Sequence, residues 1–268
     1  MRHALPLLAL GLCLSGCTPP EHDQPDRFEQ LFSGRLTVLD LTHPLNSTSP
    51  YWPGPAGNPF TYDILAAHES GAPILGAYRT PEHYGTHLDA PIHSADGQPS
   101  VDRLTAADLF GPAAVIDVSA SCAADPDYRL SKEDLLAWET QYGPLPDGAI
   151  VLMYTGWSKK WSDYAAYANQ DAEGRLHFPG FSEEAARFLI DERRIKGIGI
   201  DNMSIDYGLS RDFSVHTIVN GAGKYHLENV ADLHHLPPTG AFLIVAPIKI
   251  EGGSGGQVRL FAVLPDTP

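Results

Sequence analysis

Hydrophobic positions along the chain fall into short apolar runs of strand length and longer segments with helical spacing. Residues 149–154 are continuously apolar, which is typical of a strand covered on both faces. Residues 182–194 begin with a serine cap and two glutamates and carry one apolar face, so they predict the clearest helix. Further strands are predicted at 36–42, 113–118, 197–201, 241–248 and 257–264, a further helix at 131–138, and a helical turn at 104–110.

The order of these elements indicates the fold class. Strands and helices alternate without a break in composition, and no internal repeat is visible. The 268 residues suffice for one large domain with a sizeable core. We therefore predict a single α/β domain at residues 31–268, with a central mixed β-sheet or a barrel-like sheet flanked by helices.

The stretch 83–93, His-Tyr-Gly-Thr-His-Leu-Asp-Ala-Pro-Ile-His, concentrates metal-ligand residues. On a strand, His83, Gly85, His87 and Asp89 would share one face, and the glycine would leave room for an ion. A histidine is more often a surface or hydrogen-bonded residue, and twelve histidines make chance neighbours common. Three donors on one face, with His93 just beyond, are harder to explain that way. Their mixed nitrogen and oxygen atoms suit Zn²⁺, Mn²⁺ or Fe²⁺.

The first residues have the pattern of an export signal and are not expected to be part of the folded domain. An apolar run at 4–14 is too short to span a bilayer and is followed by Leu-Ser-Gly-Cys17. This is typical of a bacterial lipoprotein signal at 1–16, cut before a Cys17 that then carries lipid. A plain secretory signal or a misassigned start codon is the alternative. The polar, proline-rich residues 17–30 predict a flexible tether, and Thr18 favours an outer-membrane anchor facing the periplasm.

Charge and cysteine content limit the partners. Without residues 1–16 the chain loses one of its 18 basic residues and none of its 33 acidic ones, leaving 17 against 33, a net charge of −16. Such an acidic chain has no electrostatic footprint for nucleic acid, and membrane contact is expected only through the lipid. With Cys13 in the signal and Cys17 lipidated, Cys122 remains alone, so no internal disulfide is expected.

The loop at 43–54 carries Tyr51 and Trp52 among prolines and a glycine. Aromatic side chains on a loop predict either the walls of an apolar pocket or anchors that hold the loop to the core. The residues themselves favour neither interpretation.

The motif H-x-G-T-H-x-D-x-P-x-H at 83–93 resembles that of the cyclase-like metal hydrolases, which include bacterial kynurenine formamidases and isatin hydrolases. The resemblance implies that His83, His87 and Asp89 bind metal and that His93 is the catalytic acid and base. In the formamidases, a histidine and a glutamate twelve residues apart bind a second metal ion. His216 and Glu228 match that spacing, so the resemblance implies that they are metal ligands too.

The resemblance also reaches the loop. Trp52-Pro-Gly is similar to a formamidase segment whose tryptophan contacts substrate, so Trp52 and Tyr51 are expected to bind substrate. Pro55 replaces the aspartate of that segment, which changes the loop.

The implied function is hydrolysis of the C–N bond of a small aromatic amide by water activated on one or two divalent ions, Zn or Mn. An arylformamide is one expected substrate. A cyclic amide of the isatin type is the alternative, because the longer middle section at 155–182 resembles the isatin hydrolases. Relatives assemble as homo-oligomers, which we expect here too. A non-catalytic periplasmic metal-binding lipoprotein and a dehydratase or cyclase stay open.

Overall fold

The computed structural model describes residues 30, 33–34, 36–55 and 57–264. The chain divides into the units Met1–Arg35 and Leu36–Pro268, and every element below belongs to the second unit. The predicted signal at 1–16, nearly all of the tether and Cys17 lie outside the described residues. Within the described part of the chain, no helix has the length and apolar character needed to cross a membrane.

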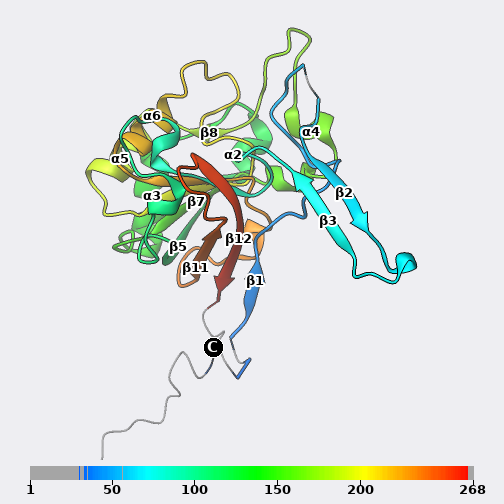
Figure 1. Ribbon diagram of the computed structural model, residues 1–268. Coiled ribbons are helices and arrows are strands. Elements are labelled where there is room, and N and C mark those ends of the chain that lie inside the picture. The colour runs from blue at the N-terminus through cyan, green and yellow to red at the C-terminus, as the bar shows by residue number, and fades with distance from the viewer. Residues whose placement is uncertain (1–29, 31–32, 35, 56, 265–268) are drawn as a thin grey trace, which may run out of the picture. The chain divides into compact units, whose positions relative to one another are not determined.

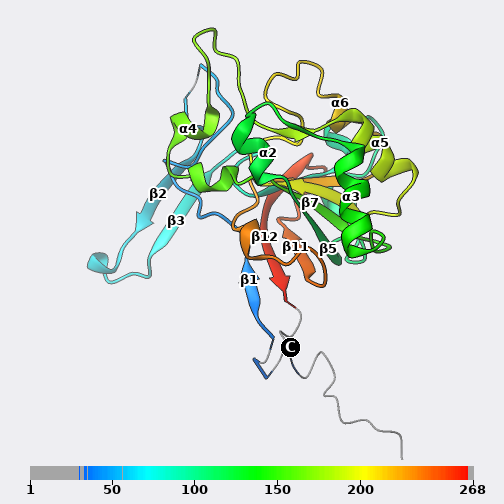
Figure 2. The same cartoon turned by 180° about the vertical axis from the view of Figure 1, so that it is seen from behind.

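A mixed sheet closes on itself to form a barrel (Figures 1 and 2). Its order is β1-β12-β11-β5-β7-β9-β10-β4, and β12 also pairs with β4, so seven strands form the ring and β1 adds to β12. Strands β5, β7, β9 and β10 run parallel, and the other pairs are antiparallel. The strands are β1 Val38–Asp40, β4 His87–Asp89, β5 Phe110–Asp117, β7 Ile150–Tyr154, β9 Gly197–Ile200, β10 Tyr225–Glu228, β11 Phe242–Pro247 and β12 Gly255–Val263. The predicted α/β class with a mixed, barrel-like sheet is confirmed.

Helices pack against the outside of the parallel strands. In Figures 1 and 2, α2, α3, α5 and α6 lie on one side of the sheet, and α4 lies beside β2 and β3. The helices are α2 Ser119–Ala124, α3 Lys132–Tyr142, α4 Tyr164–Ala168, α5 Glu183–Asp191 and α6 Ser214–Gly221. Short 3-10 turns are η1 His68–Ser70, η2 Pro91–His93, η3 Val101–Arg103, η4 Trp157–Lys160 and η5 Leu233–His235. The predicted helices at 131–138 and 182–194 are confirmed as α3 and α5, each capped by the predicted serine.

The molecule has one hydrophobic core inside the barrel and another between the sheet and the helices, and the side chains of β7 alternate between them. Ile150 and Leu152 pack inside the barrel, whereas Val151 and Met153 pack under the helices. Successive side chains of a strand face opposite sides, so a strand covered on both faces must be apolar throughout. The continuous apolar run in the sequence therefore has the predicted cause.

The same alternation places polar side chains on the outer surface of the barrel at β4 and β10. Leu88 and Leu227 pair across the two strands and point into the barrel core. Their neighbours His87 and Asp89 on β4, and Glu228 on β10, therefore face outward, where α6 and the surrounding loops bury them.

Two sequence predictions about local structure are wrong. The strand expected at 83–89 begins only at His87, because Gly85 takes a left-handed backbone with φ of 66°. The helical turn expected at 104–110 is a hydrogen-bonded turn at Thr105, with η3 just before it and β5 beginning at Phe110.

A two-stranded hairpin, β2 Thr61–Ala66 with β3 Leu75–Arg79, extends away from the barrel and was not predicted (Figure 1). Tyr62 pairs with Tyr78, and Ile64 lies on the same face of the ribbon. These three side chains are 57%, 59% and 66% exposed. A second small sheet pairs β6 Arg129–Leu130 with β8 Gly180–Phe181.

Candidate functional site

A cavity of about 210 Å³ opens on the outer surface of the barrel beside β4, β10 and the start of α6. The eight predicted site residues of the folded domain all line it, although they come from four separate parts of the sequence. They are Tyr51, Trp52, His83, His87, Asp89, His93, His216 and Glu228.

The carboxylate of Asp89 lies at the centre of this group. Its Oδ1 is 2.6 Å from Nδ1 of His83 and 3.0 Å from Nε2 of His87. Its Oδ2 faces the Nε2 atoms of three further rings, at 3.6 Å for His93, 3.8 Å for His216 and 2.8 Å for His226. One carboxylate therefore reaches the donors on both sides of the cavity floor.

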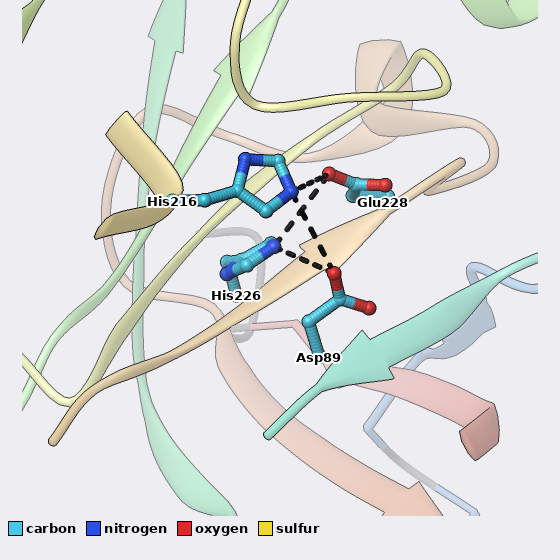
Figure 3. Close-up of side chains that lie close together, drawn as sticks. All are labelled: Asp89, His216, His226 and Glu228. Carbon is cyan, nitrogen blue, oxygen red and sulfur yellow. Dashed lines mark ion pairs between the residues drawn. The ribbon is translucent and has the colours of Figure 1, made fainter. Parts of the chain in front are cut away.

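Four buried side chains at the deep, inner end of this cavity converge on a common point (Figure 3). Besides the two contacts to Asp89, Glu228 Oε1 lies 3.4 Å from Nε2 of His216 and 3.6 Å from Nε2 of His226. A tetrahedral ion bound at about 2.0–2.1 Å separates its ligands by about 3.4 Å. The contacts among Asp89, His216, His226 and Glu228 span 2.8–3.8 Å, so the donors fit such an ion without large movement.

A second group on the outer side shares Asp89 with the first. It consists of half-buried His83, Asp89 and exposed His93, whose donor atoms also lie close enough to share an ion. The rings of His83 and His93 are 3.9 Å apart. Asp89 could therefore contribute one oxygen to each of two neighbouring positions.

Asp206 orients the His216 ring. Its Oδ2 accepts hydrogen bonds from Nδ1 of His216 at 2.7 Å and from the backbone N–H of the same residue at 3.1 Å. Its Oδ1 accepts from the backbone N–H of Val215 at 3.1 Å, so the carboxylate also caps the first turn of α6. With its proton on Nδ1, the ring directs the Nε2 lone pair at the cavity, as a metal ligand requires.

A chain of buried hydrogen bonds orients His87. Its Nδ1 donates to the carbonyl of Gly85 at 2.9 Å, which also accepts from Nδ2 of Asn229 at 2.9 Å. Tyr167 donates its hydroxyl to Oδ1 of Asn229 at 2.8 Å. A side chain at position 85 would meet Leu45 at 2.1 Å, so the turn that presents this carbonyl favours glycine.

The buried nitrogens of this site test whether an ion fits. Nε2 of His87 and Nε2 of His226 are buried without a well-aligned hydrogen-bond partner among the described residues. The 2.8 Å contact from His226 to Asp89 is short, but its geometry is not that of a hydrogen bond. An unpaired buried polar atom is costly, and coordination to an ion would satisfy each of the two nitrogens.

The electrostatics of the site follow from burial beside carboxylates. Burial opposes charge on the His87 and His216 rings, but neighbouring acids outweigh it. Asp89 raises the pKa of His87 to about 9, and Asp206 with Glu228 raises the pKa of His216 to about 10. The His93 ring has one exposed edge at the cavity, but the burial of the rest of the ring lowers its pKa to about 4. Protons and a cation therefore compete for the same inner nitrogens.

Aromatic side chains form the wall of the cavity. Tyr51 stacks on Tyr164 with ring centroids 4.5 Å apart, so it both lines the cavity and holds its loop. Trp52 is 48% exposed and packs near Phe178 and Phe213, at 6.3 and 5.9 Å between centroids. The two alternatives left open for this loop are therefore both realised.

Sequence reasoning missed His226, Asp206 and Asn229 as parts of this site. His226 and Glu228 alternate with apolar residues on β10, a pattern of period two that could have placed both on one strand face. Only the register of β10 against β4 sets His226 opposite Asp89. Asp206 and Asn229 lie in loops and carry no pattern of their own.

Comparison with known proteins identifies the family. The model of the Cyclase family matches residues 39–207, more than half of the chain. An isatin hydrolase of Roseibium aggregatum is 34% identical over 256 residues, covering 88% of this chain and 95% of that protein. A kynurenine formamidase of Salinibacter ruber is 26% identical over 238 residues, covering 87% and 99%.

Solved structures agree with this assignment. Isatin hydrolase A from Ralstonia solanacearum has a TM-score of 0.85 and 35% identity, covering 94% of this chain and all of that one. An isatin hydrolase bound to the product analogue thioisatinate has a TM-score of 0.83 and 33% identity, covering 88% and 95%. The relatives and the solved structures each cover most of this chain, and the chain belongs to the Cyclase family.

Proposed function

We propose that this protein is a metal-dependent hydrolase that cleaves the C–N bond of a small aromatic amide. The observation that carries the proposal is the position of Asp89. Its two oxygens join two groups of histidine and carboxylate donors at the floor of a cavity that is open to a small molecule. The names of the relatives, isatin hydrolase and kynurenine formamidase, support the reaction class.

Asp89, His216, His226 and Glu228 would hold one ion. His83 and His87, whose rings lie 2.6 and 3.0 Å from Oδ1 of Asp89, would hold another together with Asp89. A bound divalent ion, Zn or Mn, supplies Lewis acidity, which lowers the pKa of water and polarises the amide carbonyl. The residues of the chain then have to orient the substrate and move one proton.

His93 is suited to the proton transfer. Its ring is exposed at the cavity, and its Nε2 lies 3.6 Å from Asp89 Oδ2 in the outer group with His83. We assign it the proton and not the ion, because His83, His87 and Asp89 already offer three ligand atoms. It takes a proton from water as the oxygen bonds to the carbonyl carbon, and it gives that proton to the nitrogen as the C–N bond breaks. Help of this kind is worth about 10²–10⁴ in rate.

Replacing His93 by Ala should therefore lower turnover by about 10²–10⁴ and leave the metal content unchanged. Turnover is measured on an amide panel, and metal by elemental analysis of the same preparation. A variant that loses metal would make His93 a ligand and would contradict the proton role. Thr105→Ala, a substitution outside the residues lining the cavity, is the control.

Within this reaction class, a cyclic amide of the isatin type has specific support. Isatin hydrolases match this chain at 33–36% identity with TM-scores of 0.82–0.85, above the 26–30% identity of kynurenine formamidases such as those of Salinibacter ruber and Sphingopyxis alaskensis. An arylformamide uses the same groups. To decide between the two substrate classes, both compounds are incubated with the purified protein, with and without chelator, and the products are identified.

The same assay separates the remaining alternatives. A non-catalytic metal-binding protein retains tightly held metal and hydrolyses nothing. A dehydratase or cyclase forms or breaks bonds without net addition of water, which product masses reveal. The open cavity and the exposed His93 support hydrolysis over metal storage, since storage needs neither.

We further propose that the protein is exported and anchored by lipid on Cys17, in the outer membrane facing the periplasm. The apolar run at 4–14, followed by Ser-Gly and this cysteine, supports the proposal. Mass spectrometry of the N-terminal peptide from cells tests it. A lipidated peptide beginning at Cys17 is expected, and an unmodified N-terminus at another residue would contradict it.

A homo-oligomer is also part of the proposal. The exposed apolar face of the β2–β3 hairpin supports it, because an isolated two-stranded ribbon is marginally stable in water. Light scattering during gel filtration should give a particle mass that is a multiple of the chain mass. The substitution Ile64→Glu should reduce this particle mass. An unchanged mass for this variant would exclude the hairpin as the contact.

A further inference from the structure

Phe213 has an unusual backbone conformation for its residue type. Its φ and ψ are 49° and 46°, in the left-handed region. The other described non-glycine residues with positive φ are Asn169, Asn229 and Asp232. Asparagine and aspartate tolerate this region, whereas a bulky aromatic residue there is an outlier and is strained.

The start of α6 does not explain this choice. Phe213 is the N-cap of α6, yet its side chain makes no capping hydrogen bond. Asp206 instead accepts the backbone N–H groups of Val215 and His216. Glycine or asparagine at position 213 would serve the helix equally well, so the helix gives no reason for a phenylalanine here and its ring must be considered for another role.

The ring of Phe213 lies between the mouth and the floor of the cavity. It is 39% exposed and lines the cavity directly. Its centroid is 5.9 Å from that of Trp52 at the mouth and 5.5 Å from that of His216 at the floor, where the two rings meet edge to face at 80°. Phe213 therefore continues the aromatic wall from Trp52 down to the inner donor group.

We propose that Phe213, together with Trp52 beside it, recognises the aromatic ring of the substrate and holds it against the cavity wall with the amide directed at Asp89. This assignment rests on the proposed function. Strained backbone persists where the surrounding structure imposes it and collects at binding sites. Aromatic rings prefer edge-to-face or offset contacts with other rings, so Phe213 favours a flat substrate over a saturated one.

Binding of two ketones tests the recognition without requiring turnover. Acetophenone and cyclohexyl methyl ketone differ in ring type, and neither can be hydrolysed. Calorimetry on the metal-loaded protein gives their ratio of dissociation constants. Phe213→Ala should reduce the preference for acetophenone by up to about tenfold, the worth of one aromatic pair, and Phe213→Tyr should keep it.

A stability comparison tests the strain. At most positions alanine is at least as stabilising as glycine, because glycine leaves the unfolded chain more freedom. At position 213 the order should reverse, with Phe213→Gly melting about 2–4 °C above Phe213→Ala. Tyr142, an aromatic residue on α3 that is 42% exposed and does not line the cavity, is the control. Its alanine variant should melt at or above its glycine variant and leave the ketone ratio unchanged.

The outcomes separate this inference from the proposed function. An unchanged ketone ratio in Phe213→Ala, at equal metal content, would overturn the assignment even if the protein hydrolyses amides. The same holds if the wild-type protein shows no preference, or if Phe213→Ala melts above Phe213→Gly. Loss of the preference in Phe213→Ala together with no amide hydrolysis by the wild type would support ring recognition and refute the hydrolase proposal.

Discussion

The position of Asp206 behind His216 makes a quantitative prediction for the substitution Asp206→Asn. The carboxylate accepts four hydrogen bonds, from the backbone N–H groups of Val215 and His216, from the His216 ring and from the hydroxyl of Ser210. An asparagine can present only one oxygen, so its NH₂ group faces two of these donors. Each bond to a charged acceptor is worth at least about 1.5 kcal/mol, so the loss is about 3 kcal/mol.

Two measurements check this value and its link to the metal. The melting temperature should fall by about 6–12 °C, because 1 kcal/mol corresponds to about 2–4 °C for a domain of this size. Metal affinity, measured by competition with a chromophoric chelator, should fall by about 10- to 100-fold, as for other partners of ligating histidines. The loss of negative charge behind the ring weakens His216 as a ligand.

Asp117→Asn is the matched control. Asp117 also accepts the backbone N–H of a residue at the start of a helix, Ser119 of α2, but it does not line the cavity. Its substitution should lower the melting temperature slightly and leave metal affinity unchanged. If Asp206→Asn binds metal within twofold of the wild type, the reasoning that makes Asp206 the orienting group of His216 is refuted.

Two further predictions concern titration and reactivity. Because His87 and His216 have raised pKa values of about 9 and about 10 without an ion, both hold protons at neutral pH, and metal binding must release them. Apparent metal affinity should therefore rise at least tenfold per pH unit between pH 6 and 8, and equal affinities at these two pH values would contradict this. Burial raises the pKa of the Cys122 thiol to about 12, so iodoacetamide at pH 8 should label Cys122 only after unfolding, as mass spectrometry of its peptide would show.

The sequence predicted those features that local pattern determines. The helix α5 carries its cap, its acidic first turn and its apolar face within a dozen residues. The strand β7 is a single uninterrupted apolar run. The donors His83, His87 and Asp89 are also close in sequence, so their convergence could be expected even though only part of the segment is a strand.

What the sequence did not predict depends on contacts between distant segments. His226 reaches Asp89 through the register of two strands that are more than a hundred residues apart. Gly85 takes a left-handed backbone that breaks the expected strand, and its carbonyl oxygen accepts hydrogen bonds from both His87 and Asn229, which no local pattern reveals. The β2–β3 hairpin was not predicted because the apolar alternation of Tyr62 and Ile64 is short, and these side chains stay exposed and do not pack on the barrel.

The central claim is that one carboxylate, that of Asp89, serves both donor groups of the cavity. The most direct measurement is elemental analysis of the purified wild-type protein and of Asp89→Ala, with correct folding of both checked by circular dichroism. We predict at least one equivalent of divalent metal per wild-type chain and almost none in the variant. A folded Asp89→Ala protein that keeps the wild-type metal content would contradict the account.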